Sequence, residues 1–252
     1  MNKKIFWLAV VAVLASFAGG FLLANSLNRK ELSALRAEND SLQKAMSEAA
    51  QNDDDESLSD EEIRRRIDEA DKNPTNIAFQ KNLGLALYNY AAMKQNPALL
   101  REVSRLVTRV YQTDANDYEA VTTLGNINLA LGFYEKNNEN FVKAREFYKK
   151  ALEKKADDAD VRTDLGLTFL LANPPENDAA IAEFERALKI NAKNEKTLQG
   201  LIEALENQDK KEEAEKYAAR LREINPGNEI FIETNQSAET KPENAQGDLQ
   251  KK

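Results

Sequence analysis

Residues 121–151, VTTLGNINLALGFYEKNNENFVKAREFYKKA, decide the fold of this chain. A Leu-Gly pair stands near the start of this stretch, and a small residue, an aromatic residue and another small residue follow at Ala144, Tyr148 and Ala151. Small residues are needed where two helices cross closely, and bulky ones fill the space beside the crossing. The pattern therefore predicts two helices packed as a hairpin.

The same pattern recurs with a fixed period, which is the mark of a repeat architecture. Its Leu-Gly pairs are 41 residues apart each time and stand at Leu83-Gly84, Leu124-Gly125 and Leu165-Gly166. After the third pair, the small and aromatic positions are filled by Ala180, Phe184 and Ala187. Several copies in phase predict an array of hairpins rather than a chance match.

We divide this array, residues 61–228, into four repeats at 77–117, 118–158, 159–194 and 195–228. The helix expected at 61–72 matches the second helix of a further unit, and it should cap the exposed end of the array. In the first repeat Val103, Val107 and Val110 fill the small and aromatic positions, so we expect a wider helix crossing there. In the last repeat Ile202 occupies the Gly position.

These positions resemble the tetratricopeptide repeat (TPR) family, with its pattern of W-x-x-L-G-x-x-Y, A-x-x-x-F and a closing Pro. The Trp position departs from that pattern, because it is filled by Gln80, Val121, Arg162 and Leu198. The resemblance implies an all-α solenoid of about four helical hairpins plus the N-terminal capping helix. It also implies that the first helices of successive repeats form a groove that binds a partner protein or peptide.

The position of residues within the repeats gives the candidates for contact with such a ligand. They are Lys81, Asn82, Leu85, Tyr88, Asn89, Thr122, Asn126, Leu129, Thr163, Leu167 and Leu170. Asn82 and Asn126 are the most informative, because an amide can donate to and accept from the backbone of an extended ligand at once. The alternative interpretation is that both are ordinary solvated polar residues. Aromatic residues such as Phe133 are expected in the hairpin core, with Tyr88 as the exception.

Composition excludes most chemistry, because the chain has no His and no Cys. It therefore has no imidazole or thiolate ligand for a metal or haem, no Cys nucleophile and no Ser-His-Asp triad. No cofactor and no enzyme activity are predicted. Residues 31–252 hold 31 basic against 43 acidic residues, a net charge of −12, and this argues against binding to nucleic acid.

The N-terminal segment is predicted to reach a membrane. Residues 5–24 are apolar and uncharged, and twenty residues of helix span about 30 Å of hydrocarbon. Residues 1–4 carry Lys3 and Lys4, which should keep this n-region in the cytoplasm and send the rest of the chain to the periplasmic or other extracytoplasmic side. Arg29 and Lys30 weaken that bias. A cleaved signal peptide is the alternative to a transmembrane anchor, and it gives the same side.

Residues 28–50 show a heptad pattern that predicts a short coiled coil and a homodimer. Its seam residues include Leu32, Leu35, Asn39, Leu42 and Met46. A solvated amphipathic stalk is the alternative, because the segment is short for an isolated helix. The following linker, residues 51–60, is predicted to be an extended acidic tether, with a calcium site as the alternative. In the tail, residues 229–252, we expect Ile230, Phe231 and Ile232 to dock on the last helix, and the remainder has the composition of a disordered segment.

Together these features predict a membrane-anchored extracytoplasmic scaffold that helps to assemble an envelope complex. An anchor followed by TPR units is similar to the TPR subunits of cytochrome c maturation systems, which implies a role in presenting apocytochrome. The alternative is a structural oligomerisation factor that works through its coiled coil and binds no peptide. Substitution of residues in the groove should distinguish the two.

Overall fold

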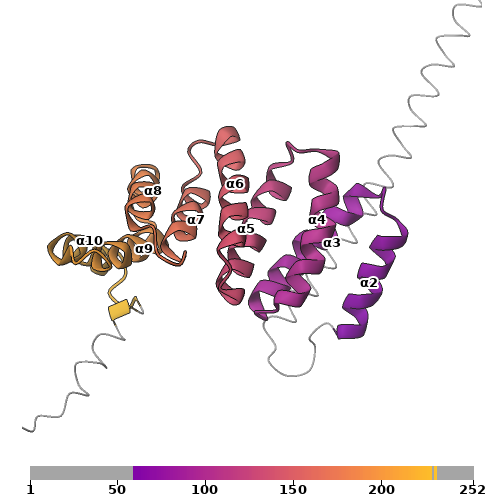
Figure 1. Ribbon diagram of the computed structural model, residues 1–252, viewed down its shortest axis with the longest axis horizontal. Helices are drawn as coiled ribbons and strands as arrows, with labels where there is room; N and C mark the ends of the chain where they lie inside the picture. The colour runs from indigo at the N-terminus through magenta and orange to yellow at the C-terminus, as the bar shows by residue number, and fades with distance from the viewer. Residues whose placement is uncertain (1–58, 229, 232–252) are drawn as a thin grey trace, which may run out of the picture. The chain divides into compact units, whose positions relative to one another are not determined.

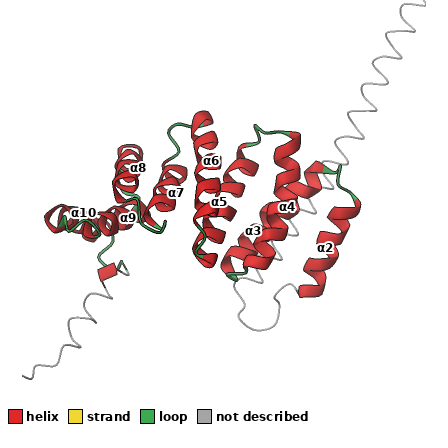
Figure 2. Ribbon diagram, viewed as in Figure 1, coloured by secondary structure: helices red, strands yellow, loops and turns green. Residues whose placement is uncertain are grey.

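The computed structural model describes residues 59–228 and 230–231, and every regular element in that part of the chain is an α-helix (Figures 1 and 2). The helices are α2 (Asp60–Lys72), α3 (Ile77–Met93), α4 (Pro97–Thr113), α5 (Tyr118–Glu135), α6 (Asn138–Lys154), α7 (Ala159–Leu170), α8 (Asn177–Ile190), α9 (Glu195–Glu206) and α10 (Lys211–Ile224). The chain divides into two compact units, Met1–Ala120 and Val121–Lys252. The predicted all-α fold is confirmed for the described residues.

Most helices begin where a short polar side chain can accept a hydrogen bond from a free backbone N–H. The side chain of Asn96 accepts from the N–H of Leu99 at 3.1 Å, and Pro97 occupies the first helical position, where no N–H is needed. Asn194 accepts from the N–H of Thr197 at 3.0 Å in the same way. Equivalent caps are formed by Ser59, Asn76, Asn137 and Asp158. The polar residues between the helices therefore set the helix boundaries.

In the N-terminal unit, α3 and α4 form a hairpin that crosses closely at Gly84. A Cβ atom added to Gly84 would lie 2.7 Å from Cγ2 of Val107 and 3.7 Å from the backbone nitrogen of the same residue. The expected wider crossing is therefore wrong. Valine is smaller than the aromatic residue it replaces, so the two backbones approach each other instead of separating.

Helix α2 packs beside this hairpin and is attached to it through Gln80, the residue at the first Trp position. The Gln80 side chain is fully buried and donates to the carbonyl oxygens of Ala70 at 2.6 Å and Asn73 at 3.2 Å. Its own oxygen accepts a hydrogen bond from Arg109 of α4 at 3.1 Å. The predicted capping helix is thus joined to the hairpin by an amide that satisfies the C-terminal carbonyls of α2.

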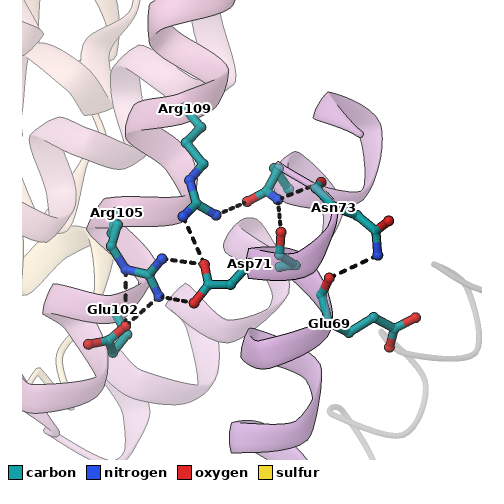
Figure 3. A network of polar contacts seen from close by, with 8 residues as sticks. Glu69, Asp71, Asn73, Glu102, Arg105 and Arg109 are labelled. Carbon is teal, nitrogen blue, oxygen red and sulfur yellow. Dashed lines mark hydrogen bonds and ion pairs between the residues drawn. The ribbon is translucent and has the colours of Figure 1, made fainter. Parts of the chain in front are cut away.

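An ion-pair network completes the attachment of α2 (Figure 3). Asp71 near the end of α2 binds the guanidinium groups of Arg105 and Arg109, both on α4, with Arg109 at 2.8 Å. Arg105 also binds Glu102 at 2.7 Å. The hydrogen bonds from Arg105 lower the pKa of the Asp71 carboxyl below its usual value, and those from Arg109 add to this effect. The C-terminal end of α2 is therefore held by charge as well as by packing.

The C-terminal unit contains the hairpins α5–α6, α7–α8 and α9–α10. At the first two crossings a glycine lies against an aromatic ring. A Cβ atom on Gly125 would lie 2.6 Å from the ring of Tyr148, and one on Gly166 would lie 2.6 Å from the ring of Phe184. Tyr148 and Phe184 are both fully buried. The close crossing predicted from the Leu-Gly pairs is confirmed.

The last hairpin differs from the expected alignment. Ile202 is buried in the Gly position, and the close contact is made by Gly200, whose added Cβ would lie 2.5 Å from the ring of Phe184 in α8. One aromatic side chain therefore packs against glycines of both α7 and α9. The period of the Leu-Gly pairs did not reveal this contact, because Gly200 lies on a different face of its helix from the earlier glycines.

The core of the C-terminal unit ends at Phe231, which is buried and joins the cluster formed by α8, α9 and α10. The guanidinium of Arg222 lies 4.3 Å from the centroid of its ring. The preceding Asn228 is buried and donates to Glu195 at 3.0 Å, while it accepts from Gln199 at 2.8 Å. The docking of Phe231 on the last helix, which the sequence predicts, is confirmed, and the residue belongs to the folded unit.

Several predicted segments lie outside the described residues. They are the n-region at 1–4, the anchor at 5–24, the coiled coil at 28–50, the tether up to residue 58 and the tail from residue 232. These stay predictions. Among the helices that are described, none has both the length and the apolar character needed to cross a bilayer.

Candidate functional site

The candidate ligand contacts of the N-terminal unit lie on α3. The charged one, Lys81, already forms ion pairs within the protein. The ammonium group of Lys81 binds Asp117 at 2.8 Å and Glu119 at 2.5 Å. Burial alone would lower the pKa of Lys81, but the hydrogen bonds to these two carboxylates outweigh it and raise the pKa above its usual value. Lys81 therefore stays charged and connects α3 to the start of α5.

The remaining candidates on α3 differ in exposure. Asn82, Leu85 and Tyr88 are half-buried, and Asn89 is exposed. The side chain of Asn82 makes no hydrogen bond with the described residues. Asn82 and Asn89 are thus the polar side chains of this helix that a ligand could reach.

In the C-terminal unit, Asn126 on α5 has a fixed orientation. Its side-chain oxygen accepts a hydrogen bond from the hydroxyl of Tyr148 at 2.8 Å, and Tyr148 is fully buried beside Gly125. The amide nitrogen of Asn126 makes no hydrogen bond with the described part of the chain, and the residue is half-exposed. Asn126 therefore presents two donor hydrogens from a rigid position, as binding to a peptide backbone requires. Thr122 and Leu129 on the same helix are half-buried.

The candidates on α7 are mostly covered by neighbouring helices. The Thr163 hydroxyl is buried and lies 2.6 Å from the hydroxyl of Thr197 on α9. Leu170 is buried in the core cluster, whereas Leu167 packs at the edge of that cluster and keeps part of its surface. The structure therefore leaves Leu167 as the member of this set that faces outward. The use of any of these residues in binding stays a prediction.

Phe133, which was expected in the hairpin core, is exposed. Its side chain is 57% exposed, and its ring lies edge-on to that of Tyr134 with the centroids 5.6 Å apart. Phe133 follows Asn126 by seven residues and Leu129 by four, so the three residues share one face of α5. That spacing was the available signal. It was missed because aromatic residues of a hairpin are usually buried.

Residues of α7 and α9, the first helices of the next two hairpins, occupy positions equivalent to this face of α5 in the repeat. Asn126 stands two residues after Leu124, Leu167 two residues after Leu165, and Glu203 two residues after Leu201. Equivalent positions in stacked hairpins point to the same side of an array. We use the term first-helix face for this surface of the C-terminal unit. It comprises Asn126, Leu129, Phe133, Leu167 and Glu203.

Two carboxyl groups of α7 and α9 have raised pKa values. Burial raises the pKa of Asp164, although Lys196 at 2.6 Å opposes the shift. Partial burial also raises the pKa of Glu203, and the charge of Glu206 adds to it. Within the described ranges no three Asp or Glu residues are placed to hold a metal ion. The first-helix face therefore offers an amide donor, apolar side chains and one carboxylate, which suit contact with another protein.

Comparisons with known proteins agree with this description of the fold. The tetratricopeptide repeat family matches residues 176–231, which cover α8 to the end of the core. No curated protein sequence matches the chain.

Similar folds occur among solved structures of MamA. MamA MSR-1 is 18% identical, with a TM-score of 0.56 over 76% of this chain and 95% of that chain. Two further MamA structures are each 19% identical, with TM-scores of 0.53 and 0.51. The first covers 73% of this chain and 87% of its own, and the second covers 71% and 90%. At these identities the likeness shows a shared fold of helical hairpins.

Proposed function

We propose that this protein is a membrane-anchored extracytoplasmic scaffold that binds a segment of a partner protein on its first-helix face. The observation that carries the proposal is the pairing of an exposed Phe133 with an oriented Asn126 on one side of α5. An exposed aromatic ring provides apolar contact, and a fixed amide donates hydrogen bonds that orient the bound segment. TPR-type hairpins support this use, because they present long surfaces built from side chains rather than a closed pocket.

The apolar segment at residues 5–24 supports the membrane anchor, and the lysines in front of it support the extracytoplasmic placement of the hairpins. An envelope assembly such as a cytochrome c maturation system is the setting that we propose for the scaffold, on the resemblance of an anchor followed by TPR units. In that setting the partner segment would belong to the protein being assembled.

Photo-crosslinking in native membranes tests the binding surface. A photoreactive amino acid at Phe133 should capture the partner, whereas one at Val142 should not. Val142 is the matched control, because it is 49% exposed and lies on the second helix of the same hairpin. Equal capture from both positions would remove the support for the first-helix face.

Substitution of Phe133 and Asn126 measures how much these two residues contribute to binding of the partner. Phe133→Ala combined with Asn126→Ala should weaken binding of the captured partner about tenfold or more, because central aromatic contacts commonly contribute over 1.4 kcal/mol. Val142→Ala should leave it unchanged. If the double variant retains its partners, the oligomerisation alternative is favoured, and Leu35→Pro in the coiled-coil segment becomes the informative variant.

A further inference from the structure

The N-terminal unit contains a pocket whose lining includes none of the candidate ligand contacts on α3. It has a volume of about 480 Å³ and opens between the first half of α2, the end of α3 and the start of α4. Its apolar floor includes Ile63, Ile67 and Leu99, each of them less than a tenth exposed. We call it the α2 pocket. Pockets of roughly 300–1,000 Å³ hold small ligands or short peptide segments, so this one has room for more than a single side chain.

The rim of the α2 pocket carries an excess of positive charge. Arg64 and Lys94 line it, and the side chains of both lack an ion pair or hydrogen bond to the described residues. Of the two acidic residues that also line it, Glu102 is neutralised by Arg105 at 2.7 Å. Asp60 is the other acidic residue of the rim. Burial raises the pKa of the Tyr90 hydroxyl, and the negative charge of Asp60 raises it further. An occupant with an apolar side chain and several carboxylates would complement this site.

The chain itself supplies such a segment directly before α2. Residues 53–58 read DDDESL, with four acidic residues followed by Ser57 and Leu58. The segment ends next to Ser59, the N-cap of α2, whose side chain accepts from the N–H of Glu62 at 3.2 Å. In capped helices an apolar residue before the N-cap commonly packs on the residue at the fourth helical position. Here those two residues are Leu58 and Ile63, and Ile63 is part of the pocket floor.

We propose that the α2 pocket is the docking site of residues 53–58 of the same chain. The Leu58 side chain packs on Ile63 in the apolar floor, and the acidic residues lie against Arg64 and Lys94. Docking holds the first turn of α2, while the ion pairs of Asp71 hold its last turn. The predicted tether then leaves the N-terminal unit in a fixed direction. The proposal is independent of the partner on the first-helix face.

Crosslinking of introduced cysteines tests the proposal in the full chain, which contains no native Cys. Leu58→Cys is combined with Ala98→Cys, an exposed residue of the pocket wall, and treated with a short bismaleimide. Ser57→Cys with Ala98→Cys is the matched control for simple proximity along the chain. We expect the Leu58 pair to react within one chain at least fivefold faster than the Ser57 pair.

Removal of the positive charges of the rim is a second test, measured as the crosslinking rate of the Leu58→Cys and Ala98→Cys pair. Arg64→Gln with Lys94→Gln, or high salt, should slow the Leu58 reaction several-fold, because exposed charges are screened. Circular dichroism confirms that each variant is folded. Equal rates for Leu58 and Ser57, or no response to removal of both charges, would overturn the proposal. So would crosslinks that form between chains, because the occupant would then be a second copy.

Discussion

At the scale of single residues, the glycines of the C-terminal unit determine how closely its helices pack. Gly125 and Gly166 each lie against a buried aromatic ring, with no room for a methyl group. The Leu-Gly spacing in the sequence was sufficient to predict these contacts, because a glycine that recurs in phase with an aromatic residue marks a position where a ring packs directly on the backbone of a helix. The contact of Gly200 was not predictable, since it falls outside that phase.

We expect Gly125→Ala to lower the free energy of unfolding by about 1–3 kcal/mol. The added Cβ would lie 2.6 Å from the Tyr148 ring, and overpacking of a rigid core typically costs that amount. Chemical denaturation followed by circular dichroism measures the change. Gly227→Ala is the matched control, because its nearest contact would be the side chain of Asn225 at 3.6 Å. A similar loss in both variants would show that contact with the ring is not the cause.

The candidate ligand contacts show where inference from sequence reaches its limit at this scale. Repeat register placed Asn126 and Leu167 on the outward face. It also assigned Thr163 and Leu170 to the groove, whereas their side chains are covered by neighbouring helices. Burial depends on how two hairpins stack, and the sequence of one hairpin does not contain that information. The exposure of Phe133 was missed for a different reason, because aromatic residues of a hairpin are usually buried and its spacing from Asn126 and Leu129 was overlooked.

At the scale of helices, α2 shows how a capping element is attached by polar as well as apolar contacts. Its first turns pack through Ile63 and Ile67, and its end is fixed by Gln80 and by the ion pairs of Asp71. The sequence predicted the helix and its capping role. It gave no indication that the Gln in the Trp position makes the attachment, because a buried amide is recognisable only from its partners.

We expect Asp71→Asn to loosen the C-terminal end of α2 by about 1 kcal/mol or less, as is usual for exposed ion pairs. Hydrogen exchange of the α2 amides should accelerate at pH 6. The folded pKa of Asp71 is lowered, so its contribution is full above about pH 4 and is lost as the pH falls through the folded pKa. Wild type and variant should therefore converge in acid. Asp68→Asn, on the same helix, should match wild type throughout, and a difference there would point to a general charge effect.

At the scale of the whole molecule, the charge is distributed unevenly along the chain. The first 30 residues contain four basic residues and no acidic one, whereas the remainder carries a net charge of −12. Charge asymmetry around an apolar segment biases its orientation in a membrane. The described helices lie entirely in the acidic portion, so the proposed anchor would place them on the side opposite Lys3 and Lys4, with Arg29 and Lys30 opposing that bias.

Cysteine labelling can test this orientation, because the chain offers no competing thiol. We expect a membrane-impermeant maleimide applied to the extracytoplasmic face to label Ala115→Cys, in the exposed loop between α4 and α5, at once. Asn2→Cys, in front of the apolar segment, should react after detergent is added. The reverse pattern would place the hairpins in the cytoplasm.

The hydrogen bond between Tyr148 and Asn126 also affects how a partner would bind. A side chain that moves freely before binding loses conformational entropy when it is immobilised, typically about 0.5–1.5 kcal/mol. Asn126 is already restrained by a hydroxyl in the hairpin core, so this ordering takes place when the hairpin folds. The first-helix face is preorganised at that point, and a complex formed there would gain affinity without any additional contact.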